Sequence, residues 1–147
     1  SRFSKGITAI YNISASESTQ KKVALLFKKV GIILDIQKES HMDDFTGLIG
    51  SGPAYFFYLL QVYEKRITNI SNGDLEKKNL IISNLLDGVS KSIASGETIE
   101  ALIKAVASKK GTTEAGIKSF QSSQLLKSFD KGIAAAIKRS KEISSEF

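Results

Sequence analysis

Residues 50–63 read Gly-Ser-Gly-Pro-Ala-Tyr-Phe-Phe-Tyr-Leu-Leu-Gln-Val-Tyr, and this stretch decides the fold class. Pro53, the only proline of the chain, suits the first residue of a helix because it has no amide hydrogen to leave unpaired there. The residues after it are apolar on nearly every side, so the helix that they form must be covered all round. That cover is either the interior of one domain or a partner chain, and periodicity leaves the two alternatives nearly even.

Helical periodicity begins at about residue 39 and continues to the last residues. A short helix is predicted from Asp43 to Leu48, ahead of the stretch quoted above. The segment Ser71-Asn72-Gly73-Asp74 is a turn that ends in a helix cap, and Thr98 is the cap of a further helix. Apolar residues at helical spacing then predict helices that begin near residues 75, 99, 112 and 125. The chain is therefore predicted to be mainly α.

Residues 1–38 have a different pattern. Ile7 to Asn12 and Ile32 to Ile36 are short runs of β-branched and aromatic residues, which is typical of strands. Between them, Ser14-Ala15-Ser16-Glu17 has the spacing of a capping box and predicts a helix that Gly31 ends. Two strands and one helix cannot cover both faces of a sheet. We therefore expect residues 1–38 to be the edge of a larger α/β domain, followed by an all-helical domain at 39–147.

Composition excludes several classes of site. The chain has no cysteine and a single histidine, His41, so we expect no disulfide, no metal centre and no serine–histidine triad. No apolar run reaches the roughly 18 residues of a membrane span, and the chain is expected to be cytoplasmic. The net charge of +6 raises the question of a nucleic-acid partner. Because the lysines occur in pairs between apolar residues, a solvated surface is favoured and no nucleic acid is expected.

Few residues offer reactive chemistry by type and spacing. Asp43 and Asp44 are adjacent, so they point in different directions on a helix, and a capping role is favoured over acid–base catalysis. Gly47, Gly50 and Gly52 match neither the dinucleotide fingerprint nor the P-loop, and close helix packing explains them better.

The segment Ser108-Lys109-Lys110-Gly111-Thr112-Thr113 combines a helix start with hydroxyl groups and two cations. Free amides at a helix amino terminus are a ready site for a carboxylate or a phosphate. On local sequence alone, an ordinary capped loop with solvated lysines is favoured over such a site.

The order of these segments resembles the pyrroline-5-carboxylate reductase family. The most specific parts are Gly50-Ser51-Gly52-Pro53-Ala54-Tyr55 and Gly111-Thr112-Thr113-x-x-Gly116. The other similar segments, in chain order, are Met42-Asp43, Thr46 to Ile49, Ser95-Gly96-Glu97 with Leu102, Ser108, Ile117 with Phe120, and the closing helix from Phe129 to Glu142. Order and spacing are shared along essentially the whole chain.

The resemblance implies an oxidoreductase that reduces 1-pyrroline-5-carboxylate to proline with NADPH or NADH, the last step of proline synthesis. In that family a Rossmann domain comes first, and an all-helical domain intertwines with its twofold mate to form a homodimer, which can assemble further. Residues 1–38 then correspond to the last strand–helix–strand of the Rossmann domain. The partner subunit would cover the apolar helix after Pro53.

The resemblance also assigns the substrate loop. The positions of Ser108, Gly111 and Thr112 receive the substrate carboxylate, and Thr113 is the catalytic position that hydrogen-bonds the ring nitrogen. The family usually has proline and glycine where this chain has Lys109 and Lys110. A side chain at position 110 is added where φ can be positive and where a ligand can approach closely. The Lys109–Lys110 substitution therefore bears directly on substrate geometry.

No glycine-rich dinucleotide turn occurs in these 147 residues. By themselves they are expected to bind no nicotinamide coenzyme tightly and to be inactive. Two hypotheses follow. In the first, the chain is part of a catalytic reductase and supplies dimerisation and the substrate loop. In the second, it is a non-catalytic relic or interaction module that keeps only the dimer scaffold, and the altered loop favours this alternative.

Overall fold

The computed structural model describes residues 5–146, and in this part of the chain a strand–helix–strand segment is followed by further helices. Packing divides the chain into two units, one formed by residues up to Pro53 together with those from Asp130 onward, the other by Ala54–Phe129. The elements are β1 (Gly6–Tyr11), α1 (Glu17–Lys28), β2 (Gly31–Ile36), α2 (Ser40–Phe45), the π-helical turn η1 (Thr46–Gly50), α3 (Gly52–Ile70), α4 (Leu75–Ile93), α5 (Ile99–Val106), α6 (Thr112–Ser122) and α7 (Leu125–Ser144). The predicted mainly α class is confirmed.

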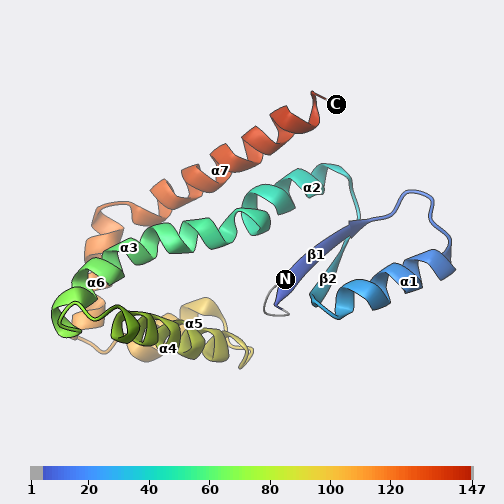
Figure 1. The fold of residues 1–147 in the computed structure, drawn as a ribbon. Helices are drawn as coiled ribbons and strands as arrows, with labels where there is room; N and C mark the ends of the chain where they lie inside the picture. The colour runs from blue at the N-terminus through green and yellow to red at the C-terminus, as the bar shows by residue number, and fades with distance from the viewer. Residues whose placement is uncertain (1–4, 147) are drawn as a thin grey trace. The chain divides into compact units, whose positions relative to one another are not determined.

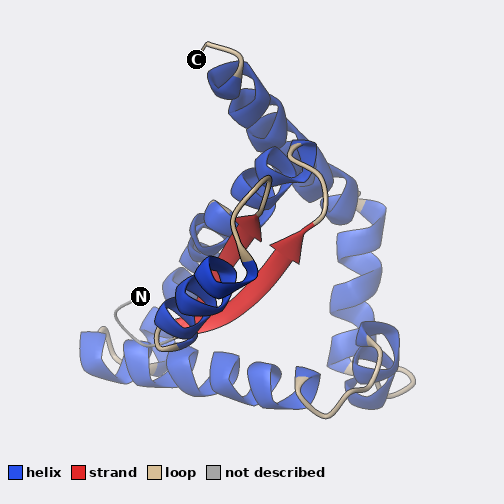
Figure 2. Ribbon diagram, turned by 90° about the vertical axis from the view of Figure 1, so that its right-hand side faces the viewer, coloured by secondary structure: helices blue, strands red, loops and turns tan. Residues whose placement is uncertain are grey.

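The first unit begins with a parallel pair of strands joined by α1. Gly6 pairs with Gly31 and Tyr11 with Ile36, and α1 packs on one face of the pair (Figure 2). The opposite face carries Ile7, Ile32 and Leu34, which are all exposed. A parallel sheet is normally covered on both faces, so these strands have the features expected of the edge of a larger α/β sheet.

The start of α1 differs from the predicted capping box. The cap is Ser16, whose Oγ accepts the Thr19 amide at 3.3 Å, and Ser14 lies outside the helix. In the loop before the cap, the Asn12 side chain accepts the Ala15 amide at 2.8 Å. The capping box predicted from Ser14 is therefore wrong, and Glu17 is the first residue of α1.

In the first unit, the carboxyl-terminal part of α7 lies beside α2 and η1 (Figure 1). Gly47 is buried there, and a Cβ atom at this position would lie 2.6 Å from the backbone nitrogen of Ile137. The close-packing interpretation is therefore supported for Gly47. Gly50 and Gly52 have no atom of the described chain within 4 Å of such a Cβ.

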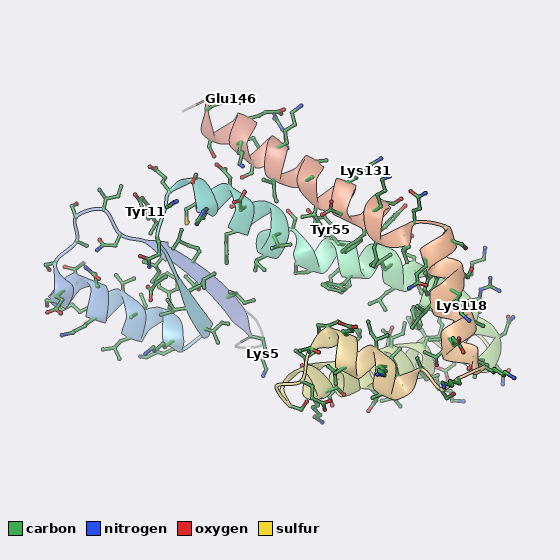
Figure 3. The ribbon with its side chains drawn as sticks, turned by 180° about the vertical axis from the view of Figure 1, so that it is seen from behind. Lys5, Tyr11, Tyr55, Lys118, Lys131 and Glu146 are labelled. Carbon is green, nitrogen blue, oxygen red and sulfur yellow. The ribbon has the colours of Figure 1, made fainter. Side chains whose placement is uncertain are left out.

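The second unit is formed by α4, α5, α6, most of α3 and the start of α7. Its predicted caps are confirmed: Asp74 accepts the Lys77 amide at 3.1 Å, and Thr98 accepts the Ala101 amide at 3.2 Å. Tyr55, labelled in Figure 3, meets Phe129 edge to face with ring centroids 6.1 Å apart. These local signals place the helix starts correctly because a cap bonds only three residues along the chain.

Apolar side chains of the second unit remain uncovered. On α3, Phe56, Phe57 and Tyr58 are 60%, 68% and 73% exposed, although the sequence around them has no polar stripe. The next two helices along the sequence, α4 and α5, form an apolar groove of about 630 Å³. Its lining residues include Val89 and Ile103. Large exposed apolar surfaces of this kind mark an interface with another chain. Of the two kinds of cover left open by periodicity, the partner chain is favoured.

Candidate functional site

The candidate site is the connection between α5 and α6 in the second unit. The carbonyl of Ser108 accepts the Gly111 amide at 3.0 Å, which closes a four-residue turn with Lys109 and Lys110 at its centre. Lys110 has φ of +59°, whereas Lys109 is outside the positive-φ region. A positive φ at the third residue is the mark of a type II turn, for which proline and then glycine are the preferred central residues. The positive φ that the family resemblance suggested for position 110 is therefore present.

Backbone amides remain open at the start of α6. Gly111 is the residue before the helix, and Thr112 and Thr113 are its first two residues. Within residues 5–146 neither threonine amide has a hydrogen-bond acceptor, as expected for the first turn of a helix. The Gly111 amide is different, because the Ser108 carbonyl already accepts it. The amides of Thr112 and Thr113 are therefore among the first-turn amides that are free to meet an anion, together with that of Glu114.

The residues assigned from the sequence lie together at this loop. Ser108 and Thr112 are exposed, while Gly111 and Thr113 are half-buried. A Cβ atom at Gly111 would overlap the Ser108 hydroxyl, so only glycine lets that hydroxyl lie against the start of α6. The hydroxyl of Ser108 and the open amides thus share one small region of surface. An anion binding there would meet donors that carry no titrating proton.

Charged side chains surround the loop. Lys109 and Lys110 lie in the turn, and Lys118 projects from α6 (Figure 3). The Lys118 ammonium lies 2.6 Å from Glu114 Oε1. The hydrogen bond from Lys118, together with one from the Lys110 amide, holds the pKa of the Glu114 carboxyl below its ordinary value. Glu114 is therefore a carboxylate at neutral pH, and its charge is locally neutralised.

A second polar cluster lies in the first unit, and the sequence pattern did not predict it. Asp43 Oδ1 accepts the hydroxyls of Ser140 at 2.8 Å and Ser144 at 2.7 Å, and Lys141 pairs with Asp44 at 3.3 Å. The capping interpretation of Asp43 is therefore wrong: Glu39 is the residue before α2, and Asp43 instead ties α2 to α7. No local signal could reveal a contact between residues about a hundred positions apart.

The hydrogen bonds from Ser144 and then Ser140 hold the pKa of the Asp43 carboxyl below its ordinary value of 3.8. A lowered folded-state pKa means that the carboxylate stabilises the fold above the unfolded value and loses this contribution as pH falls through the folded one. In the described residues 5–146, no group of three acidic or histidine side chains is placed to hold a metal ion. In the same part of the chain, no helix combines the length and apolar character needed to cross a membrane.

The loop and the helices fall within a match to one known protein family. The family described as "Pyrroline-5-carboxylate reductase dimerisation" matches residues 39–143, which include every helix from α2 to α6 and nearly all of α7. The chain belongs to this family. The resemblance inferred from the sequence segments is confirmed. The exposed apolar helices and the loop before α6 are thus parts of a pyrroline-5-carboxylate reductase dimerisation domain.

The sequences of individual reductases are similar to this chain along most of its length. Pyrroline-5-carboxylate reductase 1 of Bacillus spizizenii is 36% identical over 131 residues, a match that covers 89% of this chain and 44% of the relative. The reductase of Pseudomonas aeruginosa is 30% identical over 143 residues, covering 97% of this chain and 52% of the relative. The chain therefore spans about half the length of the curated relatives that it matches.

Solved structures show the same fold. The pyrroline-5-carboxylate reductase of Coxiella burnetii superposes with a TM-score of 0.82 at 25% identity, covering 95% of this chain and 52% of that one. A Plasmodium falciparum pyrroline carboxylate reductase with NADP bound gives a TM-score of 0.77 at 25% identity, covering 95% and 53%. The strand pair and the helices of this chain therefore occur together in reductases of this family.

Proposed function

We propose that this chain is part of an oxidoreductase that reduces 1-pyrroline-5-carboxylate to proline with NADPH or NADH. Its contribution is the dimer scaffold and the substrate loop before α6. The observation that carries the proposal is the pair of open amides at Thr112 and Thr113 beside the Ser108 hydroxyl, in a chain that belongs to the reductase dimerisation family. These groups suit a small anionic substrate because they donate hydrogen bonds without changing charge.

The chemistry can be divided between this chain and a coenzyme domain. The substrate carboxylate binds the amides of Thr112 and Thr113 and the Ser108 hydroxyl, with Gly111 leaving space for it. The Thr113 hydroxyl donates a hydrogen bond to the ring nitrogen, which gains a proton as the adjacent carbon gains a hydride. The nicotinamide supplies that hydride. Because the dinucleotide turn is absent from these 147 residues, a coenzyme domain must hold the coenzyme, and these residues alone are inactive.

The assembly that we propose is a homodimer. Burying an exposed phenylalanine or valine side chain contributes roughly 1.5–3 kcal/mol, and many such side chains on α3, α4 and α5 are uncovered. A second copy of the chain can cover these helices with matching apolar helices of its own, as in an isologous interface. The dimer therefore buries apolar surface that the second unit leaves exposed by itself.

Thr113→Ala tests the reaction proposal. In the polypeptide that joins this chain to its coenzyme domain, the variant should lower kcat/KM for 1-pyrroline-5-carboxylate by roughly 10–100-fold, because a hydrogen bond to a group that gains charge contributes about 1.5–3 kcal/mol. NADPH oxidation is followed at steady state. The control is Thr68→Ala, since the Thr68 hydroxyl bonds the Glu64 carbonyl inside α3, away from the loop in sequence. Kinetics of Thr113→Ala equal to those of the control would remove the assigned role.

The alternative proposal is a non-catalytic relic or interaction module. The observation that favours it is the turn itself, where Lys109 and Lys110 occupy the positions that proline and glycine prefer. Under this alternative the intact polypeptide forms the dimer but does not oxidise NADPH with 1-pyrroline-5-carboxylate. The same assay on the unaltered protein therefore separates the two functions.

A further inference from the structure

Glu114 holds the turn that precedes α6. Its Oε2 accepts the backbone amide of Lys110, four residues earlier, while its Oε1 receives the Lys118 ammonium at 2.6 Å. Both carboxylate oxygens are therefore occupied, one by the loop and one by the helix. The side chain is only one-third exposed, whereas that of Lys118 is 70% exposed. The carboxylate lies against the backbone of the turn and the ammonium lies outside it.

The turn lacks the residue types that would stabilise it without help. In a type II turn, proline presets the second residue and glycine accepts the positive φ of the third. Lysine at both positions does neither, and Lys110 nevertheless has φ of +59°. A left-handed conformation is unfavourable for a residue with a Cβ atom, so contacts elsewhere must hold it. The hydrogen bond to Glu114 acts directly on the residue that needs it.

The ion pair with Lys118 compensates the negative charge that Glu114 places near the start of α6. An isolated carboxylate in the first turn of a helix occupies the electrostatic position that an incoming substrate carboxylate would use. Lys118, one helical turn further on, compensates that charge while leaving the amides of Thr112 and Thr113 open. Glu114 can therefore shape the loop without repelling an anion from it.

We propose that Glu114 is a positioning residue of the substrate loop: it holds Lys110 in the left-handed conformation and so presents the amides of Thr112 and Thr113 to the substrate carboxylate. The inference rests on the proposed reductase function and adds a residue to it. Glu114 does not touch the reacting atoms. Its effect is on substrate affinity, and it acts through residue 110.

The test compares Glu114→Ala and Glu114→Gln in the intact polypeptide with its coenzyme domain. Glu114→Ala should raise KM for 1-pyrroline-5-carboxylate by roughly three- to tenfold and change kcat by less than about twofold, on the scale of a lost helix-start hydrogen bond. Glu114→Gln keeps an oxygen for the Lys110 amide, so its KM should fall between those of the unaltered protein and Glu114→Ala. The matched control is Asp87→Ala, which removes a carboxylate from a similar 2.6 Å pair with Lys91 on α4. It should leave KM unchanged.

Combining Glu114→Ala with Lys110→Gly tests whether the change in KM is transmitted through residue 110. Glycine accepts positive φ without a Cβ clash, so the turn no longer needs the carboxylate. In this background Glu114→Ala should change KM by less than about twofold, which is the signature of coupling between the two positions. An unchanged KM for Glu114→Ala in the native loop, or an equal increase in both backgrounds, would overturn the inference.

Amide hydrogen exchange gives a readout that does not require turnover. The Lys110 amide should be protected in the unaltered protein and should exchange faster in Glu114→Ala, but not in Asp87→Ala. If the unaltered protein fails to oxidise NADPH while its Lys110 amide is protected, the reductase function is wrong and the contact stands. If the unaltered protein is active and Glu114→Ala changes neither exchange nor KM, the function stands and the positioning role is wrong.

Discussion

Replacing Lys110 by glycine should stabilise the protein. Lys110 combines an exposed side chain with φ of +59°, so the substitution removes a conformational penalty without removing a buried contact. The penalty of a left-handed conformation is about 1–2 kcal/mol for a residue with a Cβ atom. Glycine is also freer in the unfolded chain, which opposes the gain by about 0.5–1 kcal/mol. The net stabilisation is therefore between about 0 and 1.5 kcal/mol.

Lys109→Gly is the matched control, because it removes the neighbouring lysine from the same turn. Lys109 is outside the positive-φ region, so glycine there brings the entropic penalty without relief and destabilises by about 0.5–1 kcal/mol. Both variants lose one of two adjacent positive charges, and the charge effect cancels in the comparison. The predicted difference between them is about 1–2 kcal/mol, or roughly 2–8 °C in Tm for a chain of this size.

Urea unfolding and thermal melts measure this difference. The protein concentration must be the same for every variant, since the stability of a dimer depends on it. Equal midpoints for Lys110→Gly and Lys109→Gly would refute the reasoning, because the left-handed conformation at position 110 would then have no energetic consequence. A lower midpoint for Lys110→Gly would show that the lysine side chain itself stabilises the loop.

Three further predictions concern the helices. Gly47→Ala should destabilise by roughly 1–3 kcal/mol in thermal melts, because its Cβ would meet the backbone of Ile137 at 2.6 Å, whereas Gly132→Ala, with no atom within 4 Å, should not. Asp43→Asn should destabilise at pH 7, and urea titrations should show this difference shrinking as pH falls from the unfolded-state value of 3.8 towards the lower folded-state pKa, since the unfolded carboxyl takes up its proton before the native one. Ile103→Glu places a charge in the α4–α5 groove and should convert a dimer to a monomer in light scattering at micromolar concentration; a native monomer would contradict the proposed assembly.

Much of the candidate site could be predicted from the sequence alone. A helix end, a helix start and two lysines locate the loop, and the glycine that the related family usually has at position 110 anticipates its positive φ. The sequence did not indicate that the Ser108 carbonyl engages the Gly111 amide. Which amides stay open depends on how the turn closes, and turn closure is a property of the backbone geometry. The role of Glu114 was missed for the same reason, although its place in the first turn of a helix is a recognisable signal.

Local chemistry along the chain determined the helices and strands. Asp74 and Thr98 begin their helices because a cap bonds an amide only three residues away, and the residue types after Pro53 are enough to show that this helix needs cover on every side. Tertiary structure alone decided the long-range contacts. Gly47 meets Ile137, and Asp43 accepts hydroxyls from α7, because the chain returns to α2 after about a hundred residues. Periodicity records which face of a helix is apolar, but it does not record which distant segment will cover that face.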